Sequence, residues 1–169
     1  MKNIFLVLVG LTLFSAPLYA VGNGDFGLGV IVGDPFGPTA KYWFNDSRAL
    51  DIGMGFPSDF KLYGDYLWTS WDIFPQPAQG RLATSLGLGP RLVFLHDDTQ
   101  LGLRTVAGLY YWVARNPLEI FLEIAPVFVV SPETSTDIDA GIGIRYYFNM
   151  LPVPRHSSST SSHKKSKYK

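Results

Sequence analysis

The sequence predicts an all-β protein with one domain, an eight-stranded antiparallel up-and-down β-barrel. Large apolar residues alternate with glycine or charged residues at a period of two along most of residues 26–148, which is typical of half-buried strands. Clusters of Gly, Pro, Asn, Asp and Ser separate these segments, and most connections are short, as in a meander of neighbouring strands. The chain has no cysteine, so its stability cannot depend on disulfides.

The strands expected from this alternation follow one another in chain order. They are Phe26–Gly33, Thr39–Asn45, Ala49–Phe56, Asp59–Thr69, Arg81–Leu95, Leu101–Ala114, Leu118–Val129 and Asp137–Phe148. The last shows the pattern most clearly, because Ile138, Ile142 and Phe148 alternate with charged, glycine or tyrosine residues. Among the connections only residues 70–80 make a long one.

Two further segments flank the barrel domain, which we expect to span residues 21–150. Residues 1–20 have the features of a Sec-type signal peptide, with Lys2, an apolar run and a cleavage site after Ala20. Residues 151–169 form a Ser-rich basic tail with five Lys and Arg and no acid, and we expect it to be disordered because it can bury little apolar area. Residues 21–150 instead carry eight Lys and Arg against fourteen Asp and Glu, a balance of −6.

The polar phase of the strands is expected to face the interior of the barrel. An eight-stranded barrel has little internal room, and glycine beside long, oppositely charged side chains fills a narrow lumen. Five positive and five negative residues share this phase, which is the balance that a packed interior demands. The predicted lumen charge network consists of Lys41, Asp51, Lys61, Asp65, Arg91, Arg104, Glu119, Glu123, Asp139 and Arg145. On the alternative interpretation these are solvated surface charges.

The apolar phase is then expected to face lipid. Every even-numbered segment ends in an aromatic cluster, and with both termini on the periplasmic side all four clusters lie at that rim. The clusters include Trp43, Tyr110, Trp112 and Tyr147, and the predicted membrane belt within them consists of Tyr42, Phe44, Tyr66, Trp68, Tyr111, Tyr146 and Phe148. A second girdle at the opposite rim would contain Phe56, Phe60, Phe94 and Phe128. Two girdles around an apolar band predict transmembrane strands.

Several motifs resemble those of a known class of barrels. The pattern Gly143-x-x-Tyr146-x-Phe148 resembles the terminal-strand signal by which outer-membrane barrels are recognised for insertion. Together with residues 27–37, 41–43, 65–68 and 140–148, it resembles a family of small uncharacterised bacterial outer-membrane barrels, similar in architecture to the membrane domains of OmpA and OmpX. The resemblance covers residues 24–148. It implies location in the outer membrane, outer-membrane lipid and the barrel-insertion machinery as partners, and no enzymatic residues.

The residues offer little for catalysis, cofactor binding or metal binding, and we expect no such site. The only histidine of residues 21–150 is His96, and a lipid-modifying enzyme would use it as a base, but its aspartate neighbours diverge in a tight turn. A metal site is conceivable only if the connections that carry Asp97, Asp98, Glu133 and Asp137 converge. Export and an acidic barrel domain argue against binding of nucleic acid.

The function expected from the sequence is therefore a non-enzymatic one. We expect a monomeric outer-membrane barrel with a structural or surface-interaction role and a closed lumen of paired charges. One alternative is a porin-like barrel that binds or transports a small ligand, although paired charges and a narrow diameter oppose a continuous aqueous pore. The lysines of the tail could contact peptidoglycan or another anionic polymer.

Overall fold

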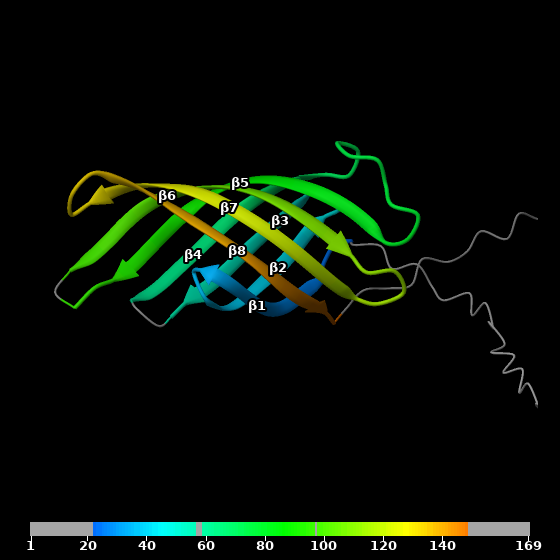
Figure 1. Ribbon diagram of the computed structural model, residues 1–169, viewed down its shortest axis with the longest axis horizontal. Helices are drawn as coiled ribbons and strands as arrows, with labels where there is room; N and C mark the ends of the chain where they lie inside the picture. The colour runs from blue at the N-terminus through cyan, green and yellow to red at the C-terminus, as the bar shows by residue number, and fades with distance from the viewer. Residues whose placement is uncertain (1–21, 57–58, 97, 149–169) are drawn as a thin grey trace, which may run out of the picture.

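The computed structural model describes residues 22–56, 59–96 and 98–148, which form a closed barrel of eight strands in chain order (Figure 1). The strands are β1 (Phe26–Asp34), β2 (Gly37–Asn45), β3 (Arg48–Gly55), β4 (Phe60–Ser70), β5 (Arg81–Phe94), β6 (Thr99–Trp112), β7 (Leu118–Ser131) and β8 (Ser135–Tyr147). Every neighbouring pair is antiparallel, including β1 with β8. The fold class predicted from the sequence is confirmed. The expected signal peptide and basic tail lie outside the described residues.

The observed strand bounds differ from the expected ones mainly at the ends. β2 begins at Gly37 because Gly37 pairs with Ile31, which the proline beside it did not suggest. β6 ends at Trp112, since the backbone then turns through residues 113–117. Within the described residues no helix is long and apolar enough to cross a membrane.

The strand register fixes the tilt and width of the barrel. The row of paired residues that starts at Arg145 passes once round the barrel and returns to β8 at Ser135, ten residues away. A shear of ten residues over eight strands corresponds to a tilt of about 40° and a backbone radius of about 8 Å. Such a cylinder encloses only enough space for side chains.

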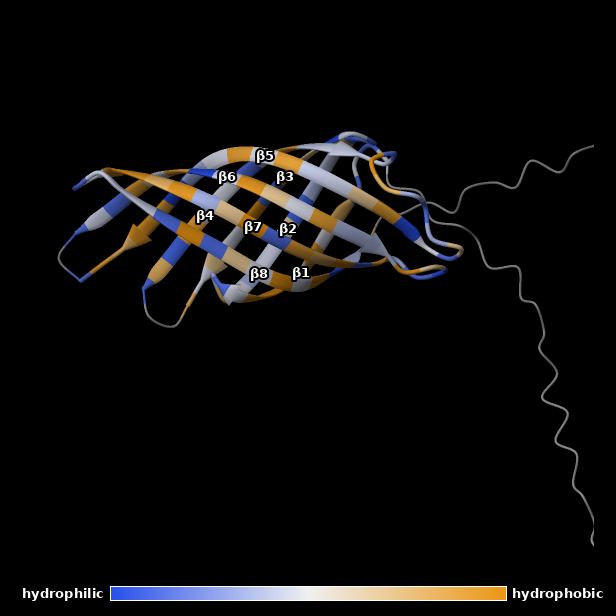
Figure 2. Ribbon diagram, turned by 45° about the horizontal axis from the view of Figure 1, so that its top comes forward, coloured by the Kyte–Doolittle hydropathy of each residue, from blue (hydrophilic) through white to orange (hydrophobic). Residues whose placement is uncertain are grey.

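The two faces of the wall follow the period-two alternation. Along β7, buried and exposed residues alternate from Glu119 to Val130, and Figure 2 shows the corresponding alternation of hydropathy along the strands. The outward side chains are large and apolar, with Leu86 66% and Leu122 55% exposed. Apolar residues therefore cover the outside of the barrel, whereas the charged phase is enclosed.

The two ends of the barrel differ. The described chain termini meet at one end, where the Phe148 N–H donates to the Phe26 carbonyl, and we call this the terminal end. It also carries the connections β2–β3, β4–β5 and β6–β7. The opposite end, here the hairpin end, has only the short connections β1–β2, β3–β4, β5–β6 and β7–β8, and these reach to unequal distances (Figure 1).

Candidate functional site

Charged side chains fill the interior of the barrel and are the most concentrated polar chemistry in the described structure. The barrel encloses nine of the ten residues predicted for the lumen network, each at most 2% exposed. They are Lys41, Asp51, Asp65, Arg91, Arg104, Glu119, Glu123, Asp139 and Arg145. Strands β2 to β8 each contribute at least one of them, because alternate positions of every strand point inward.

Arg145 on β8 is the centre of one half of this network. Its guanidinium lies 2.6 Å from Asp51, 2.8 Å from Glu119 and 3.6 Å from Glu123. It also donates to the Thr39 hydroxyl at 2.8 Å, and that hydroxyl donates to Asp51 at 3.0 Å. Arg145 thus joins side chains of β2, β3 and β7 across the lumen.

Arg104 on β6 is the centre of the other half. Its guanidinium contacts Asp65, lies 3.2 Å from Asp139 and lies 3.7 Å from Glu123. Asp139 in turn accepts from Arg91 at 2.5 Å. Because Glu123 lies within 4 Å of both Arg104 and Arg145, the two halves form one continuous network. A carboxylate that loses its cation in such a network remains buried with an uncompensated charge, so the contacts are strongly interdependent.

Lys41 extends the network toward the terminal end through aromatic rings. Its Nζ lies 3.6 Å from Glu119 but has no hydrogen-bond acceptor among residues 22–56, 59–96 and 98–148. Instead it lies 3.4 Å from the centroid of the Tyr110 ring and 4.8 Å from that of Trp43. A buried ammonium is stabilised by the negative faces of such rings. Sequence reasoning missed this cage, although Trp43 and Lys41 share the same strand phase.

The position of Lys61 differs from the expectation that it lies in the closed lumen. Lys61 sits at the hairpin end, where its Nζ pairs with Asp34 at 2.5 Å and the two side chains are 15% and 56% exposed. Lys61 is the second residue of β4, so its inward side chain lies at the opening of the lumen at the hairpin end, here called the mouth, and not in the packed centre. The enclosed set consequently has four cations and five anions instead of five of each.

Aromatic side chains close the lumen at the terminal end. The four aromatic clusters lie at this end, but they do not lie wholly on the outer face, because alternate residues of a cluster point inward. The inward members are Trp43, Tyr110, Trp112 and Tyr147, which are buried. Trp71 from the β4–β5 connection packs on this group, with ring centroids 4.9 Å from Trp112 and 6.3 Å from Trp43. We call Trp43, Trp71, Tyr110, Trp112 and Tyr147 the aromatic plug. Hydrogen bonds from Trp43 Nε1 to Tyr147 Oη and from Tyr147 Oη to Glu119 join the plug to the charges.

One further acid lies beside the plug, outside the strands. The Asp25 carboxylate accepts the Gly22 N–H at 2.6 Å. Burial raises the pKa of Asp25 above its ordinary value, and the hydrogen bond acts in the opposite direction.

The residues predicted for the membrane belt point outward at the terminal end. Tyr42, Phe44, Tyr66 and Trp68 form a continuous row of rings whose centroids are separated by 5.4, 6.0 and 5.0 Å. Tyr146 and Phe148 form a second pair at 5.2 Å, and Tyr111 lies between the two groups, half-buried. Near the hairpin end the outward rings of Phe56, Phe60 and Phe94 follow one another at 5.4 and 5.6 Å.

The predicted insertion signal divides between the two faces. Tyr146 and Phe148 are outward and exposed. Gly143 is inward, and a Cβ there would lie 2.2 Å from Cζ of Phe121 and 2.5 Å from the Val30 carbonyl oxygen. This glycine is therefore needed for packing of the interior whatever its part in recognition.

The residues considered for enzymatic and metal chemistry do not form a common site in the described structure. His96 lies in the β5–β6 connection, and Asp97 beside it lies outside the described residues. The Asp137 carboxylate is already paired with Arg91 at 2.7 Å. No group of three His, Cys, Asp or Glu among the described residues could hold a metal ion.

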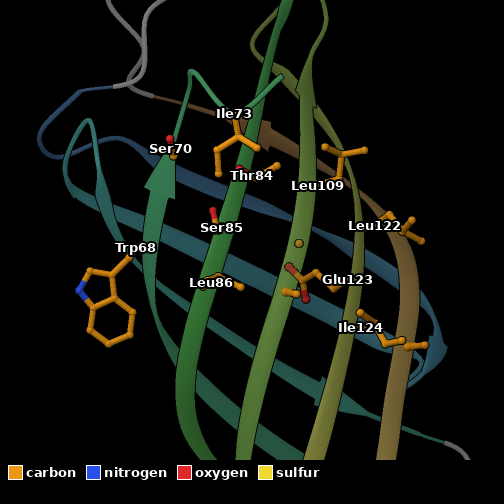
Figure 3. A pocket seen from close by; sticks show the side chains of 13 residues that line it. Trp68, Ser70, Ile73, Thr84, Ser85, Leu86, Leu109, Leu122, Glu123 and Ile124 are labelled. Atoms are coloured by element: carbon orange, nitrogen blue, oxygen red, sulfur yellow. The ribbon is translucent and has the colours of Figure 1, made fainter. Parts of the chain in front are cut away.

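A hollow with a volume of about 680 Å³ lies on the outer wall. Outward side chains of β5 to β7, including Leu86, Leu109 and Ile124, border it (Figure 3). Its lining is apolar, and the neighbouring Glu123 carboxylate belongs to the interior network. The hollow therefore suits hydrocarbon and offers no set of polar groups for chemistry.

Comparison with known proteins supports the architecture. The crystal structure of the N-terminal β-barrel domain of OprF from Pseudomonas aeruginosa is similar with a TM-score of 0.53 and 17% identity, covering 76% of this chain and 100% of that chain. The crystal structure of Neisserial surface protein A has a TM-score of 0.39 and 17% identity over 74% and 94% of the two chains. No protein-family description and no curated protein matches the sequence. At this identity the likeness to the OprF domain shows a shared fold.

Proposed function

We propose that this chain is a non-enzymatic outer-membrane barrel that acts as a closed structural element of the envelope. The observation that carries the proposal is the combination of an apolar outer wall with a lumen filled by ion pairs and the aromatic plug. Inside-out patterning of this kind matches a barrel that has lipid outside and no water column inside. Outer-membrane lipid is then the main partner, and the barrel is a monomer.

The apolar wall supports the membrane location. Large apolar side chains lie outward and exposed on all eight strands, among them Val30, Ile52, Leu103 and Ile142. A soluble monomer rarely exposes a contiguous apolar patch of more than a few hundred Å². Lipid chains would cover this surface, including the hollow beside Leu109, and the aromatic rows at both ends would lie at headgroup level.

The filled lumen supports a closed state. Arg104 and Arg145 reach through the interior to strands that are not their neighbours in the sheet, and the aromatic plug lies nearer the terminal end. With a backbone radius of about 8 Å, these side chains leave no continuous passage for hydrated ions. Transport through the lumen would first require several desolvated ion pairs to separate.

The short connections favour a structural role over a surface-interaction role. With the termini in the periplasm, the hairpin end faces the exterior, and none of its connections has more than four residues. Outer-membrane barrels usually have short periplasmic turns and longer extracellular loops, so on this orientation the barrel lacks the long loops that could present a binding surface. The signal peptide at residues 1–20, the insertion signal and a contact of the tail with peptidoglycan remain parts of this proposal.

The test combines fractionation with conductance of the same purified protein. We expect the full chain to fractionate with outer membranes, to show a heat-dependent shift in gel mobility as closed barrels do, and to give no reproducible current steps in planar bilayers. A soluble, detergent-independent barrel would overturn the membrane location. Regular open-channel currents from heat-shiftable protein would overturn the closed lumen.

A further inference from the structure

The apolar wall of the barrel is wedge-shaped. Along the barrel axis, each residue of a strand rises about 2.5 Å and each step from one strand to the next along a paired row climbs about 3 Å, given the tilt of about 40°. At the hairpin end, the outermost apolar residue is Phe36 on the side of β1–β2 and Val130 on the side of β6–β7. Measured from the aromatic belt, the apolar wall is about 15 Å tall at β1–β2 and about 27 Å tall at β6–β7. Figure 1 shows the same inequality, with the β1–β2 connection ending well short of the β5–β6 and β7–β8 connections.

The terminal end is level by the same measure. Tyr42, Trp68, Tyr111 and Tyr146, one on each even-numbered strand, lie within about 4 Å of one another along the axis. A rigid tilt of the barrel that levelled the hairpin end would therefore make the terminal end uneven. The wedge cannot be removed by orientation.

The space above the short side of the wall is bordered by polar groups. β1 ends at Asp34, which pairs with Ala140, so residues 135–139 of β8 have β7 on one side and no strand on the other. Asp137 on this segment is in the inward phase, so its half-exposed carboxylate faces the mouth of the lumen, where it pairs with Arg91 at 2.7 Å. Asp34 and Lys61 form their exposed ion pair nearby on the same rim.

These polar groups lie at a depth that lipid chains cover on the opposite side. Asp137 is at about the height of Phe128 and Leu101, which are outward and exposed on the tall side. Hydrocarbon cannot satisfy the backbone groups of an open strand edge, so the edge of residues 135–139 needs water or headgroups. The tall side matches a hydrocarbon thickness of about 25 Å, whereas the short side falls about 10 Å below it.

We propose that the barrel locally thins the leaflet at its hairpin end over β1–β3, so that lipid headgroups and water descend to Asp34 and to the open edge of β8. This inference rests on the proposed membrane location. The interacting partner is the bilayer itself, compressed on one side of the barrel and of ordinary thickness on the other. The asymmetry follows from strand length alone and needs no bound ligand.

Nitroxide depth measurements on paired sites test the proposal directly. The chain has no cysteine, so single cysteines can be labelled without other changes. Met54 on β3 and Thr105 on β6 are both outward and lie within about 1 Å of the same height along the barrel axis. The paired row from Met54 reaches Leu101 on β6 after three strands, and Thr105 lies four residues from Leu101 toward the terminal end, which cancels the climb. Leu50 and Leu109 form the matched pair near the terminal end.

In phosphatidylcholine vesicles, oxygen and nickel-chelate accessibilities should place the label at Met54 at least about 5 Å closer to the headgroups than the label at Thr105. Leu50 and Leu109 should lie at equal depth. Equal depths at Met54 and Thr105 would refute the proposal, and so would unequal depths at Leu50 and Leu109, which indicate a rigid tilt. Water exposure at all four sites would instead refute the membrane location. Ile52 and Ala107 form a further matched pair if a label prevents folding at the first.

Discussion

Replacement of Arg145 by methionine tests whether the interior charges hold the barrel together. Arg145 contacts three buried carboxylates, but its removal leaves them with different numbers of remaining cation contacts. Glu119 keeps Lys41 and Glu123 keeps Arg104 within 4 Å. Among the described residues, Asp51 keeps no cation within 4 Å and only the Thr39 hydroxyl.

The size of the effect follows from Asp51. Removing one partner of a buried ion pair typically costs about 3–5 kcal/mol, because the remaining charge is left desolvated. We expect Arg145→Met to lower the free energy of unfolding by about that amount, and Asp51→Asn in the same chain to restore at least about 1 kcal/mol, since the amide has no charge to leave unpaired. Arg48→Met is the matched control on an exposed strand end, with an expected effect of less than about 0.5 kcal/mol.

The assay is urea unfolding of the full chain in lipid vesicles, followed by tryptophan fluorescence and by gel mobility. Equal slopes with denaturant must accompany the shift in midpoint, so that the variants can be compared. A loss of less than about 1 kcal/mol for Arg145→Met, or further destabilisation by Asp51→Asn in that background, would refute the interdependent network.

Three further predictions use the same assay or an assembly assay. Gly143→Ala should destabilise the barrel by about 2 kcal/mol or more, because its Cβ would overlap the Phe121 ring, and Phe121→Leu should relieve part of the loss, a rescue that a purely recognition role for Gly143 would not give. Lys41→Met should cost much less than Arg145→Met, since Glu119 retains Arg145, and an equal loss would contradict this ranking. Phe148→Ala should slow assembly into outer membranes in cells more than it lowers stability in vesicles, and a parallel loss in both would assign it to packing alone.

The alternation in the sequence specifies which residues share one face of a strand, and the structure encloses nine of the ten charged residues named from it, with Lys61 at the mouth. Arg104 and Arg145, for example, are in phase with neighbouring inward glycines on their own strands. The partners of each charge could not be predicted, because contact across the lumen depends on the shear. Arg91 on β5 reaches Asp139 on β8 only because the ladder returns to β8 ten residues displaced.

Some residues of the aromatic plug could have been placed inside from the sequence, whereas one could not. Trp43 is two residues after Lys41 and Trp112 is two residues after Tyr110, so strict application of the period would have placed them inside. Trp71 gave no such signal, because it lies in an irregular connection whose path is set by contacts with the finished barrel. The position of Lys61 at the mouth was hidden for a related reason, since alternation specifies a face of a strand but not its height.

The filled lumen and the wedge-shaped wall are physically connected. A barrel could level an uneven rim by sliding its strands, but each slip would move Arg145 or Arg104 away from carboxylates on other strands and cost about 3–5 kcal/mol for each broken pair. Bilayer deformation costs only fractions of a kcal/mol per Å of mismatch, or a few kcal/mol for about 10 Å on one side. In the proposed membrane location the bilayer would therefore deform before the barrel, and the ion pairs, together with the backbone ladder, would maintain the strand-length asymmetry.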